Sequence, residues 1–193
     1  WAQKWSTEQL WETEEGKRIA LSYFHERGFT DATIKEFQLG YVPERGNVFG
    51  TGKSLPLLAM AHRLPYVATA TVADLHDLEA KVTCAMGVSG ARYLHVLVPC
   101  PLGWGHPTDE TIRIARLAAE CGLFPVFEAE HGEVTSVTKI RRHVPVEEYL
   151  QPQKRFAHLF GTSGHPEMVA RIQADADANI RRFNLLDAST EVA

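Results

Sequence analysis

The chain has 193 residues, of which 45% are hydrophobic and 23% charged, and its formal net charge at pH 7 is −4. This composition supports a folded core and argues against an intrinsically disordered chain. The slightly acidic balance argues against a nucleic-acid-binding surface. No run of about 18 apolar residues is present, so the sequence predicts no membrane span, and no basic-then-apolar leader marks it for secretion.

The first region, residues 1–45, is predicted to be helical. Apolar side chains are spread among charges over residues 7–27, and Gly28 is a suitable C-terminal stop. Thr30 or Asp31 can cap a second, shorter helix.

A Gly-rich seam follows at residues 46–54. Its sequence Asn47-Val-Phe-Gly-Thr-Gly-Lys-Ser54 nearly fits the phosphate-binding loop G-x-x-x-x-G-K-[ST], with asparagine in place of the first glycine. The preceding Pro43-Glu-Arg45 does not suit a buried strand, and no apolar strand ending in Asp follows to help hold Mg²⁺. A nucleotide site and a flexible connector are the two alternatives for this seam.

Residues 55–193 are predicted to alternate strands and helices. In the order βαβαββα, the predicted elements are strands at 65–72 and 92–98, helices at 74–86 and 108–121, strands at 124–130 and 133–140, and a helix at 166–183. The near-continuous apolar run at 92–98 is typical of a strand covered on both faces. The order predicts an α/β fold with a mostly parallel sheet and a terminal hairpin turned at His131-Gly132.

Spacing along the helices predicts which faces are buried. The predicted apolar faces are Ile34 and Phe37 on the short N-terminal helix, Leu75, Leu78 and Val82 on the helix at 74–86, and Ile112, Ala115 and Ala119 on the helix at 108–121, which Thr108 is expected to cap.

The cysteines Cys84, Cys100 and Cys121 are widely spaced and form no CxxC or CxxH pair. They predict neither a disulfide framework nor a self-contained zinc site, and we expect a reducing, cytoplasmic setting. Cys100 follows the predicted strand at 92–98, where open α/β sheets usually bind ligands. The alternative is a half-buried thiol that packs a turn, as free cysteine often does.

The segment Leu94-His-Val-Leu-Val-Pro-Cys-Pro-Leu-Gly-Trp104 resembles the part of 2-oxoacid:ferredoxin oxidoreductase β subunits that carries a cysteine after a buried strand. Other stretches agree in order and spacing: Ala61-His-Arg-Leu-Pro-Tyr-Val-Ala-Thr-Ala70, Asp77-Leu-Glu-Ala-Lys81, Ile112-Arg-Ile-Ala-Arg-Leu-Ala-Ala-Glu-Cys-Gly-Leu-Phe-Pro-Val-Phe-Glu128, Pro145-Val-Glu-Glu-Tyr-Leu150 and Arg155-Phe-Ala-His-Leu159. The resemblance covers residues 55–186 approximately. It implies a partial fold of the thiamine-diphosphate-binding type over residues 55–193.

In that family the β subunit binds thiamine diphosphate and Mg²⁺, and often one [4Fe–4S] cluster held by four cysteines. With its other subunits, the enzyme oxidatively decarboxylates a 2-oxoacid such as pyruvate. It passes the electrons to ferredoxin and the acyl group to coenzyme A. The resemblance assigns one metal ligand, Cys100, which matches the family's late cluster cysteine, and thiolate sulfur suits iron–sulfur iron.

This sequence departs from the family upstream of Ala61-His62. The motifs that hold the Mg²⁺–diphosphate are replaced there by other sequence, and no CxxC pair supplies the remaining cluster ligands. We therefore assign no catalytic or thiamine-contacting residue. The chain is expected to be an incomplete part of such a subunit and inactive alone.

Gly16-Lys-Arg-Ile-Ala-Leu-Ser-Tyr-Phe-His-Glu-Arg-Gly-Phe-Thr-Asp-Ala-Thr-Ile-Lys-Glu-Phe-Gln-Leu-Gly-Tyr41 is similar to a segment of bacterial replicative DNA primase. The zinc ligands and acidic metal-binding motifs of primases are absent. Arg18, Arg27 and Lys35 are candidates to contact a phosphate backbone, and a solvated helix face is the alternative. The two resemblances together indicate a possible chimera.

Other polar residues carry weaker signals. Lys139-Ile-Arg-Arg-His143 either receives an anionic partner, such as the phosphates of coenzyme A, or forms a solvated strand end. His62, His95 and His106 have no metal-ligand spacing between them. His95 is expected to be a core or interface histidine.

Overall fold

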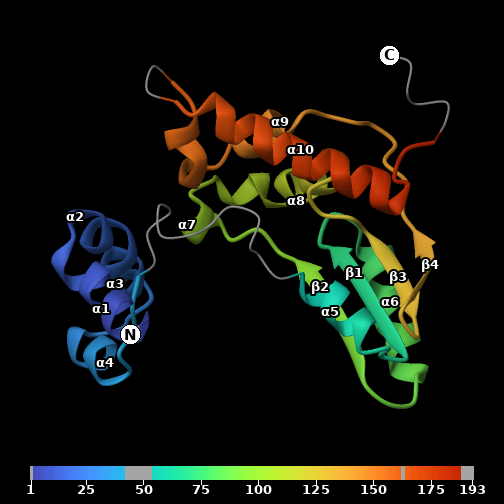
Figure 1. Cartoon of the computed structure of the whole chain (residues 1–193), viewed down its shortest axis with the longest axis horizontal. Helices are drawn as coiled ribbons and strands as arrows, with labels where there is room; N and C mark the ends of the chain where they lie inside the picture. Colours follow the sequence, from blue (N-terminus) through green and yellow to red (C-terminus); the bar gives the residue numbers. More distant parts are fainter. Residues whose placement is uncertain (1, 42–53, 162–163, 188–193) are drawn as a thin grey trace. The chain divides into compact units, whose positions relative to one another are not determined.

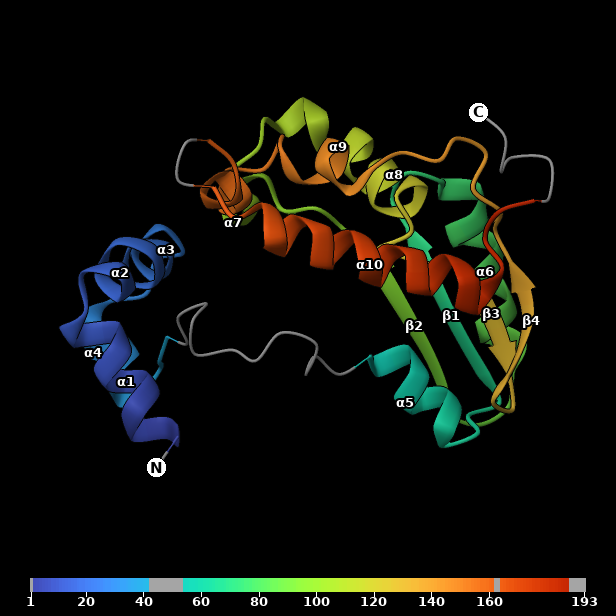
Figure 2. The ribbon, with the colours of Figure 1, turned by 45° about the horizontal axis from the view of Figure 1, so that its top comes forward.

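The structure is a computed structural model that describes residues 2–41, 54–161 and 164–187 (Figures 1 and 2). The chain divides into two compact units, Trp1–Lys53 and Ser54–Ala193. The near-match to a phosphate-binding loop at 47–54 lies outside the described residues except for Ser54.

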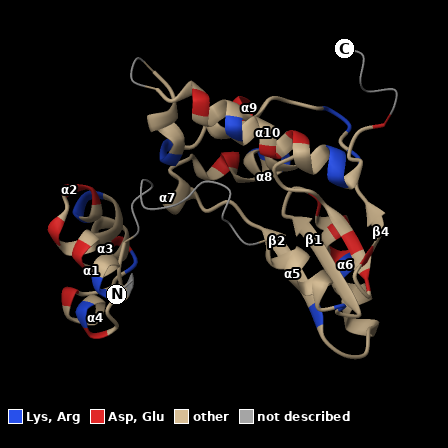
Figure 3. Cartoon of the chain, viewed as in Figure 1, with Lys and Arg blue, Asp and Glu red and all other residues tan. Residues whose placement is uncertain are grey.

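The described part of the first unit is helical. Its elements are α1 (Ala2–Glu12), α2 (Glu14–Gly16), the π-helical turn η1 (Lys17–Leu21), α3 (Ser22–Glu26) and α4 (Asp31–Glu36). Leu10, Leu21 and Ile34 form its buried centre. Charged side chains of both signs are spread over these helices (Figure 3).

The local signals at α3 and α4 are partly confirmed. Gly28 ends the helical stretch with φ of +80°. Thr30 caps α4 through Oγ1, which accepts a hydrogen bond from Thr33 N at 3.2 Å. The predicted pairing of Ile34 with Phe37 is wrong: Phe37 is 67% exposed, because α4 ends at Glu36 and Phe37 lies beyond its last turn.

A four-stranded sheet organises the second unit, in the order β2-β1-β3-β4. Its strands are β1 (Tyr66–Thr71), β2 (Arg92–Leu97), β3 (Phe127–Glu130) and β4 (Glu133–Val137). The α/β class is confirmed, and so is the terminal hairpin, which turns through His131 and Gly132 with φ of +50° and +94°.

The sheet is mixed, whereas the sequence predicts a mostly parallel one. The β1/β2 ladder is parallel, and the β1/β3 and β3/β4 ladders are antiparallel. The reason lies at Thr69, whose Oγ1 donates to Pro125 O at 2.7 Å and accepts from Phe127 N at 2.9 Å. These bonds bring the chain into β3 from the carboxyl end of β1, so it runs antiparallel to β1 without crossing the sheet.

Helices cover both faces of this sheet (Figure 2). Helix α6 (Leu75–Gly87) packs on one face, where Tyr66, Ala68 and Ala85 are buried together. Helices α5 (Leu55–Ala61) and α10 (Pro166–Phe183) pack on the other face, and Phe183 stacks on Phe127 with ring centroids 4.8 Å apart. Side chains alternate between the faces, as they must along a strand.

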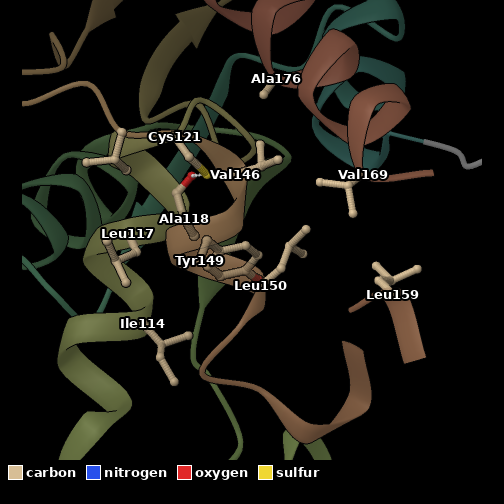
Figure 4. Packing of buried hydrophobic residues seen from close by; sticks show 11 residues of the cluster. Ile114, Leu117, Ala118, Cys121, Val146, Tyr149, Leu150, Leu159, Val169 and Ala176 are labelled. Atoms are coloured by element: carbon tan, nitrogen blue, oxygen red, sulfur yellow. Dashed lines mark hydrogen bonds between the residues drawn. The ribbon is translucent and has the colours of Figure 1, made fainter. Parts of the chain in front are cut away.

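A helical layer forms the largest buried cluster of the unit (Figure 4). Its elements are α7 (Pro101–Trp104), η3 (Thr108–Glu110), α8 (Thr111–Glu120), α9 (Val146–Leu150), η4 (Lys154–Leu159) and α10. Ile114, Leu117 and Leu150 are at most 3% exposed within it. None of the helices in the described ranges has the length and apolarity that a membrane span needs.

Two predicted apolar faces are displaced. On α6, Leu75 and Val82 are 66% and 41% exposed and Leu78 is half-buried, whereas the fully buried residues of the helix are Lys81 and Ala85. The spacing identified an apolar stripe correctly, but this stripe is not the one that meets the sheet.

On α8, the predicted Ala115 is buried and Ala119 is half-buried, but Ile112 is 45% exposed, and the other buried residues are Ile114, Leu117 and Ala118. Thr108 does not cap α8, because it lies in the preceding 3₁₀ turn, where no side-chain cap bond forms.

The apolar strand β2 also differs from its prediction. It lies at the edge of the sheet, and its residues from Tyr93 to Leu97 are half-buried rather than covered on both faces. The fully buried strand is β1, whose six residues are all buried.

Candidate functional site

Cys100 lies at the carboxyl end of β2, where the chain turns away from the sheet. Pro99 is fully buried and Cys100 is half-buried. Cys100 is the N-cap residue of α7, and its Sγ accepts a hydrogen bond from Gly103 N at 3.4 Å. The geometry thus places Cys100 just beyond the carboxyl end of a strand, as the sequence predicts, and its role as a metal ligand stays a prediction.

The turn that carries Cys100 rests on η4. The guanidinium carbon of Arg155 lies 3.7 Å from the centre of the Trp104 ring. A Cβ at Gly105, which has φ of +69°, would come within 2.7 Å of Lys154 Cβ. The stacking of Arg155 on Trp104 and the close approach of Lys154 to Gly105 hold α7 in place. They therefore also hold the backbone turn at Cys100.

Arg155 is itself held by two polar partners. Its Nε donates to Gln153 Oε1 at 2.9 Å, and its Nη2 donates to the Tyr149 hydroxyl at 3.2 Å. Burial lowers the pKa of Arg155, since desolvation disfavours the charged form. Among the described residues no carboxylate pairs with Arg155, so this cation stands close to the Cys100 turn without a compensating charge.

The other two thiols are placed differently. Cys84 is exposed on α6, and Cys121 is buried at the end of α8. Burial raises the pKa of the Cys121 thiol to about 11, so it stays protonated and unreactive at neutral pH. In the described part of the chain, no three His, Cys, Asp or Glu side chains are grouped closely enough to hold a metal ion. The described residues thus offer Cys100 as a candidate ligand, without a grouped set of metal-binding side chains.

The histidines are not assembled into a ligand set. His106 is buried, its Nδ1 lies 2.8 Å from Pro107 O, and its Nε2 has no hydrogen-bond partner. His95 packs edge-on against Phe124, with ring centroids 5.6 Å apart, and its Nδ1 also has no partner. The expectation that His95 is a packing histidine agrees with this contact.

A cavity of about 250 Å³ opens at the carboxyl end of β1, between α6, α8 and the segment after β4. Its charged lining residues are Asp74, Asp77, Arg116, Glu120, Lys139 and Arg141. Of these lining residues, the sequence analysis singled out only Lys139 and Arg141, as part of the candidate anion-binding stretch from Lys139 to His143. Lys139 is already engaged, with Nζ 3.6 Å from Asp187 Oδ1.

Sequence reasoning missed the role of Lys81 beside this cavity. Lys81 is 3% exposed, and its Nζ donates to Asp77 Oδ2 at 2.7 Å and to Thr69 O at 3.0 Å. The signal was the Asp-to-Lys spacing of four residues on one helix. A buried ammonium bound to a carboxylate and a strand carbonyl ties α6 to β1.

No family model matches the chain. The chain is 47% identical over 133 residues to pyruvate synthase subunit PorB of Methanosarcina barkeri. These residues cover 69% of this chain and 45% of that protein. It is 40% identical over 133 residues to PorB of Methanocaldococcus jannaschii, with coverage of 69% and 43%.

A third relative is ketoisovalerate oxidoreductase subunit VorB of Pyrococcus furiosus. It is 39% identical over 104 residues, which cover 53% of this chain and 33% of VorB. The chain therefore spans less than half the length of these relatives. The similarity supports the resemblance to 2-oxoacid oxidoreductase β subunits. The primase-like segment stays a prediction.

Proposed function

We propose that the second unit is the C-terminal part of the β subunit of a 2-oxoacid:ferredoxin oxidoreductase. The observation that carries this proposal is 47% identity over 133 residues to a pyruvate synthase subunit. The complete enzyme would oxidatively decarboxylate a 2-oxoacid of the pyruvate type, reduce ferredoxin and form an acyl-coenzyme A. This chain would need the other oxidoreductase subunits as partners.

Within that proposal, Cys100 is one thiolate ligand of a [4Fe–4S] cluster. Its position beyond β2, its incomplete burial and the N–H of Gly103 directed at its Sγ all suit a cluster ligand. Neither exposed Cys84 nor buried Cys121 combines these features.

Thiamine diphosphate, Mg²⁺ and the remaining cluster cysteines belong to the part of such a subunit that this chain does not match. The described residues fit no complete cluster site, and none is assigned to the thiamine cofactor. What this chain supplies is a scaffold, in which the contacts of Trp104 and Gly105 with η4 hold the Cys100 turn at the sheet edge.

A hybrid subunit, in which one segment is replaced, tests the proposal. The matched part of M. barkeri PorB is replaced by the matched part of this chain, and the hybrid subunit is assembled with its natural partners. We expect the hybrid to keep pyruvate-dependent ferredoxin reduction. Cys100→Ser is expected to remove the electron paramagnetic resonance signal and the iron of one cluster, whereas the matched control Cys84→Ser retains both. A hybrid with full cluster content despite Cys100→Ser would refute the ligand assignment.

The first unit is outside this proposal. If its resemblance to primases reflects function, the full chain binds single-stranded DNA at low salt, and Arg18→Gln weakens that binding. The described structure gives no support for this alternative, because Arg27 and Lys35 instead lie over the rings of Tyr23 and Trp11, at 5.1 and 4.7 Å.

A further inference from the structure

The cavity at the carboxyl end of β1 combines an apolar wall with a charged lining. Strands β1 and β2 direct their carboxyl ends toward the helical layer (Figure 1), and the cavity of about 250 Å³ lies there beside β1. Ligand sites in proteins are mostly apolar, with a few polar groups that fix the orientation of the ligand. The larger apolar side chains of this wall are Phe124, Pro125, Val126, Ile140 and Leu185.

Two of the three cations that line the cavity have no partner in the described part of the chain. Arg116 comes from α8 and Arg141 from the segment after β4, and both are exposed. Neither forms a hydrogen bond or an ion pair with a described residue. Lys139, the third cation, is held by Asp187 and by Asn184 O. The two guanidinium groups are therefore available to a ligand, and their planar forks match the two oxygens of a carboxylate.

The three carboxylates of the lining differ in the same way. Asp77 accepts from Lys81 at 2.7 Å, and Glu120 lies 3.9 Å from Arg142. Asp74 has no cation among the described residues, and its Oδ1 accepts only from Asp77 N at 3.0 Å, as the cap of α6. A carboxylate has about four acceptor positions, so Asp74 can cap the helix and also receive an ammonium group.

We propose that this cavity binds a small α-amino acid with an apolar side chain. The carboxylate of the amino acid pairs with Arg116 and Arg141, its ammonium group with Asp74, and its side chain packs on the apolar wall. The two signs of charge reach the cavity from different elements, since Asp74 begins α6 and the arginines lie on α8 and after β4. This site goes beyond the proposed function, because none of its residues belongs to the Cys100 turn.

The charge and size of the cavity favour a zwitterion over other ligands. Three cationic and three anionic side chains line it, so its net charge is zero, and a simple anion would leave Asp74 uncompensated. A divalent cation is disfavoured as well, because the described His, Cys, Asp and Glu residues form no group of three that could hold a metal ion. A volume of about 250 Å³ lies just below the range for drug-sized ligands, which begins at about 300 Å³, so a small molecule fits better than a nucleotide.

Calorimetric titration of the full chain tests the ligand class. The probes are L-valine, its analogue without the ammonium group (3-methylbutanoate), its analogue without the carboxylate (isobutylamine) and inorganic phosphate. We expect L-valine to bind at least about tenfold more tightly than each of the other three, because only the zwitterion satisfies both sets of charges. L-leucine and L-phenylalanine then establish which side chain the apolar wall prefers.

Single substitutions test the two ends of the site separately. Arg116→Gln and Arg141→Gln are each expected to weaken the binding of L-valine by about tenfold or more. Asp74→Asn retains the helix cap, since asparagine caps as well as aspartate does. This variant is expected to weaken L-valine binding and to leave 3-methylbutanoate binding no weaker than before.

Arg113→Gln is the matched control. Arg113 lies three residues before Arg116 on α8, pairs with Glu110 and does not line the cavity. It is expected to retain L-valine binding. Melting temperatures without ligand establish that each variant is folded, and added L-valine should raise the melting temperature of the unsubstituted chain and of the control.

Three results would overturn the proposal. One is the absence of binding by all three amino acids at about 10 mM, a concentration that detects even millimolar affinity. The second is phosphate or 3-methylbutanoate binding as tightly as L-valine, which would make the site one for simple anions. The third is an equal loss in Arg113→Gln and Arg116→Gln. The proposed function is judged separately, by the cluster signal of the hybrid subunit.

Discussion

Strands β1 and β2 pair in parallel along their whole length, and each has four apolar residues of six, yet they differ in burial. All six residues of β1 are buried, and two of them are threonines. No residue of β2 is fully buried, because β2 ends the described sheet and its outer side, the open edge, carries no further ladder there. The comparison shows that position in the sheet, more than apolar content, determines how far a strand is buried.

The polar residues of β1 are tolerated because each has a partner. Thr69 Oγ1 bridges Pro125 and Phe127, and Thr71 Oγ1 accepts from Ala73 N at 3.2 Å. Buried hydroxyls that are satisfied in this way cost little, and they direct the next segment of chain. Substitutions in β1 should therefore lower the free energy of unfolding of the isolated chain strongly, and substitutions around the open edge of β2 should lower it little.

The largest effect is expected beneath β1, at the ion pair of α6. Asp77→Asn leaves the Lys81 ammonium, which is 3% exposed, without its carboxylate. We expect the free energy of unfolding to fall by about 3 kcal/mol, since removing one partner of a buried pair leaves an uncompensated charge. Denaturant unfolding measures this. Glu79→Gln, on the exposed side of the same helix, is the control and should change little.

Thr69→Val is the second test and acts within β1 itself. The isosteric change leaves Phe127 N and Pro125 O without their partner in a buried place. A loss of about 2 kcal/mol is expected in the free energy of unfolding. Thr135→Val on exposed β4 is the matched control. Equal effects of the two substitutions would show that the bridge does not hold β3 to β1.

The sequence predicted the order of these elements better than their environment. Period and capping signals located β1, β2, α6 and α10 to within one or two residues, because those signals are local. They did not reveal that β2 is an edge strand, since edge position depends on β3 joining the other side of β1 through Thr69. They also placed the wrong face of α6 against the sheet, because the buried Lys81 reads as a solvated charge until its partners are known.

At the candidate site, too, the sequence predicted the local features and not the long-range contacts. The strand-end position of Cys100 follows from local sequence. The support from Arg155 and Lys154 does not, because these residues lie about 50 positions later in the chain. No spacing rule connects two such segments. The turn geometry at Gly105 is visible in the sequence only as a glycine, and its close approach to Lys154 appears only in the fold.

Tyr66, at the start of β1, offers a pH-dependent test of smaller size. Burial and the hydrogen bond to Glu128 raise its pKa above the usual 10.0. The unfolded tyrosine therefore ionises first, so this contribution to stability is present below pH 10 and is lost as the pH rises above it. Tyr66→Phe should cost about 1 kcal/mol at pH 7 and show a shallower decline above pH 10. An unchanged decline would contradict the assignment.

The smallest effect is expected at the exposed apolar stripe of α6, formed by Leu75, Val82 and Met86. Met86→Gln replaces a side chain that is 77% exposed, so the free energy of unfolding of the chain alone should change by less than about 0.5 kcal/mol. Ala85→Gln, one position earlier, puts the same side chain at a site that is 5% exposed and should cost several times more through overpacking. Paired thermal unfolding curves measure both. If Met86→Gln were as costly as Ala85→Gln, the stripe would already be covered in this chain, and the contrast between β1 and the open edge of β2 would fail.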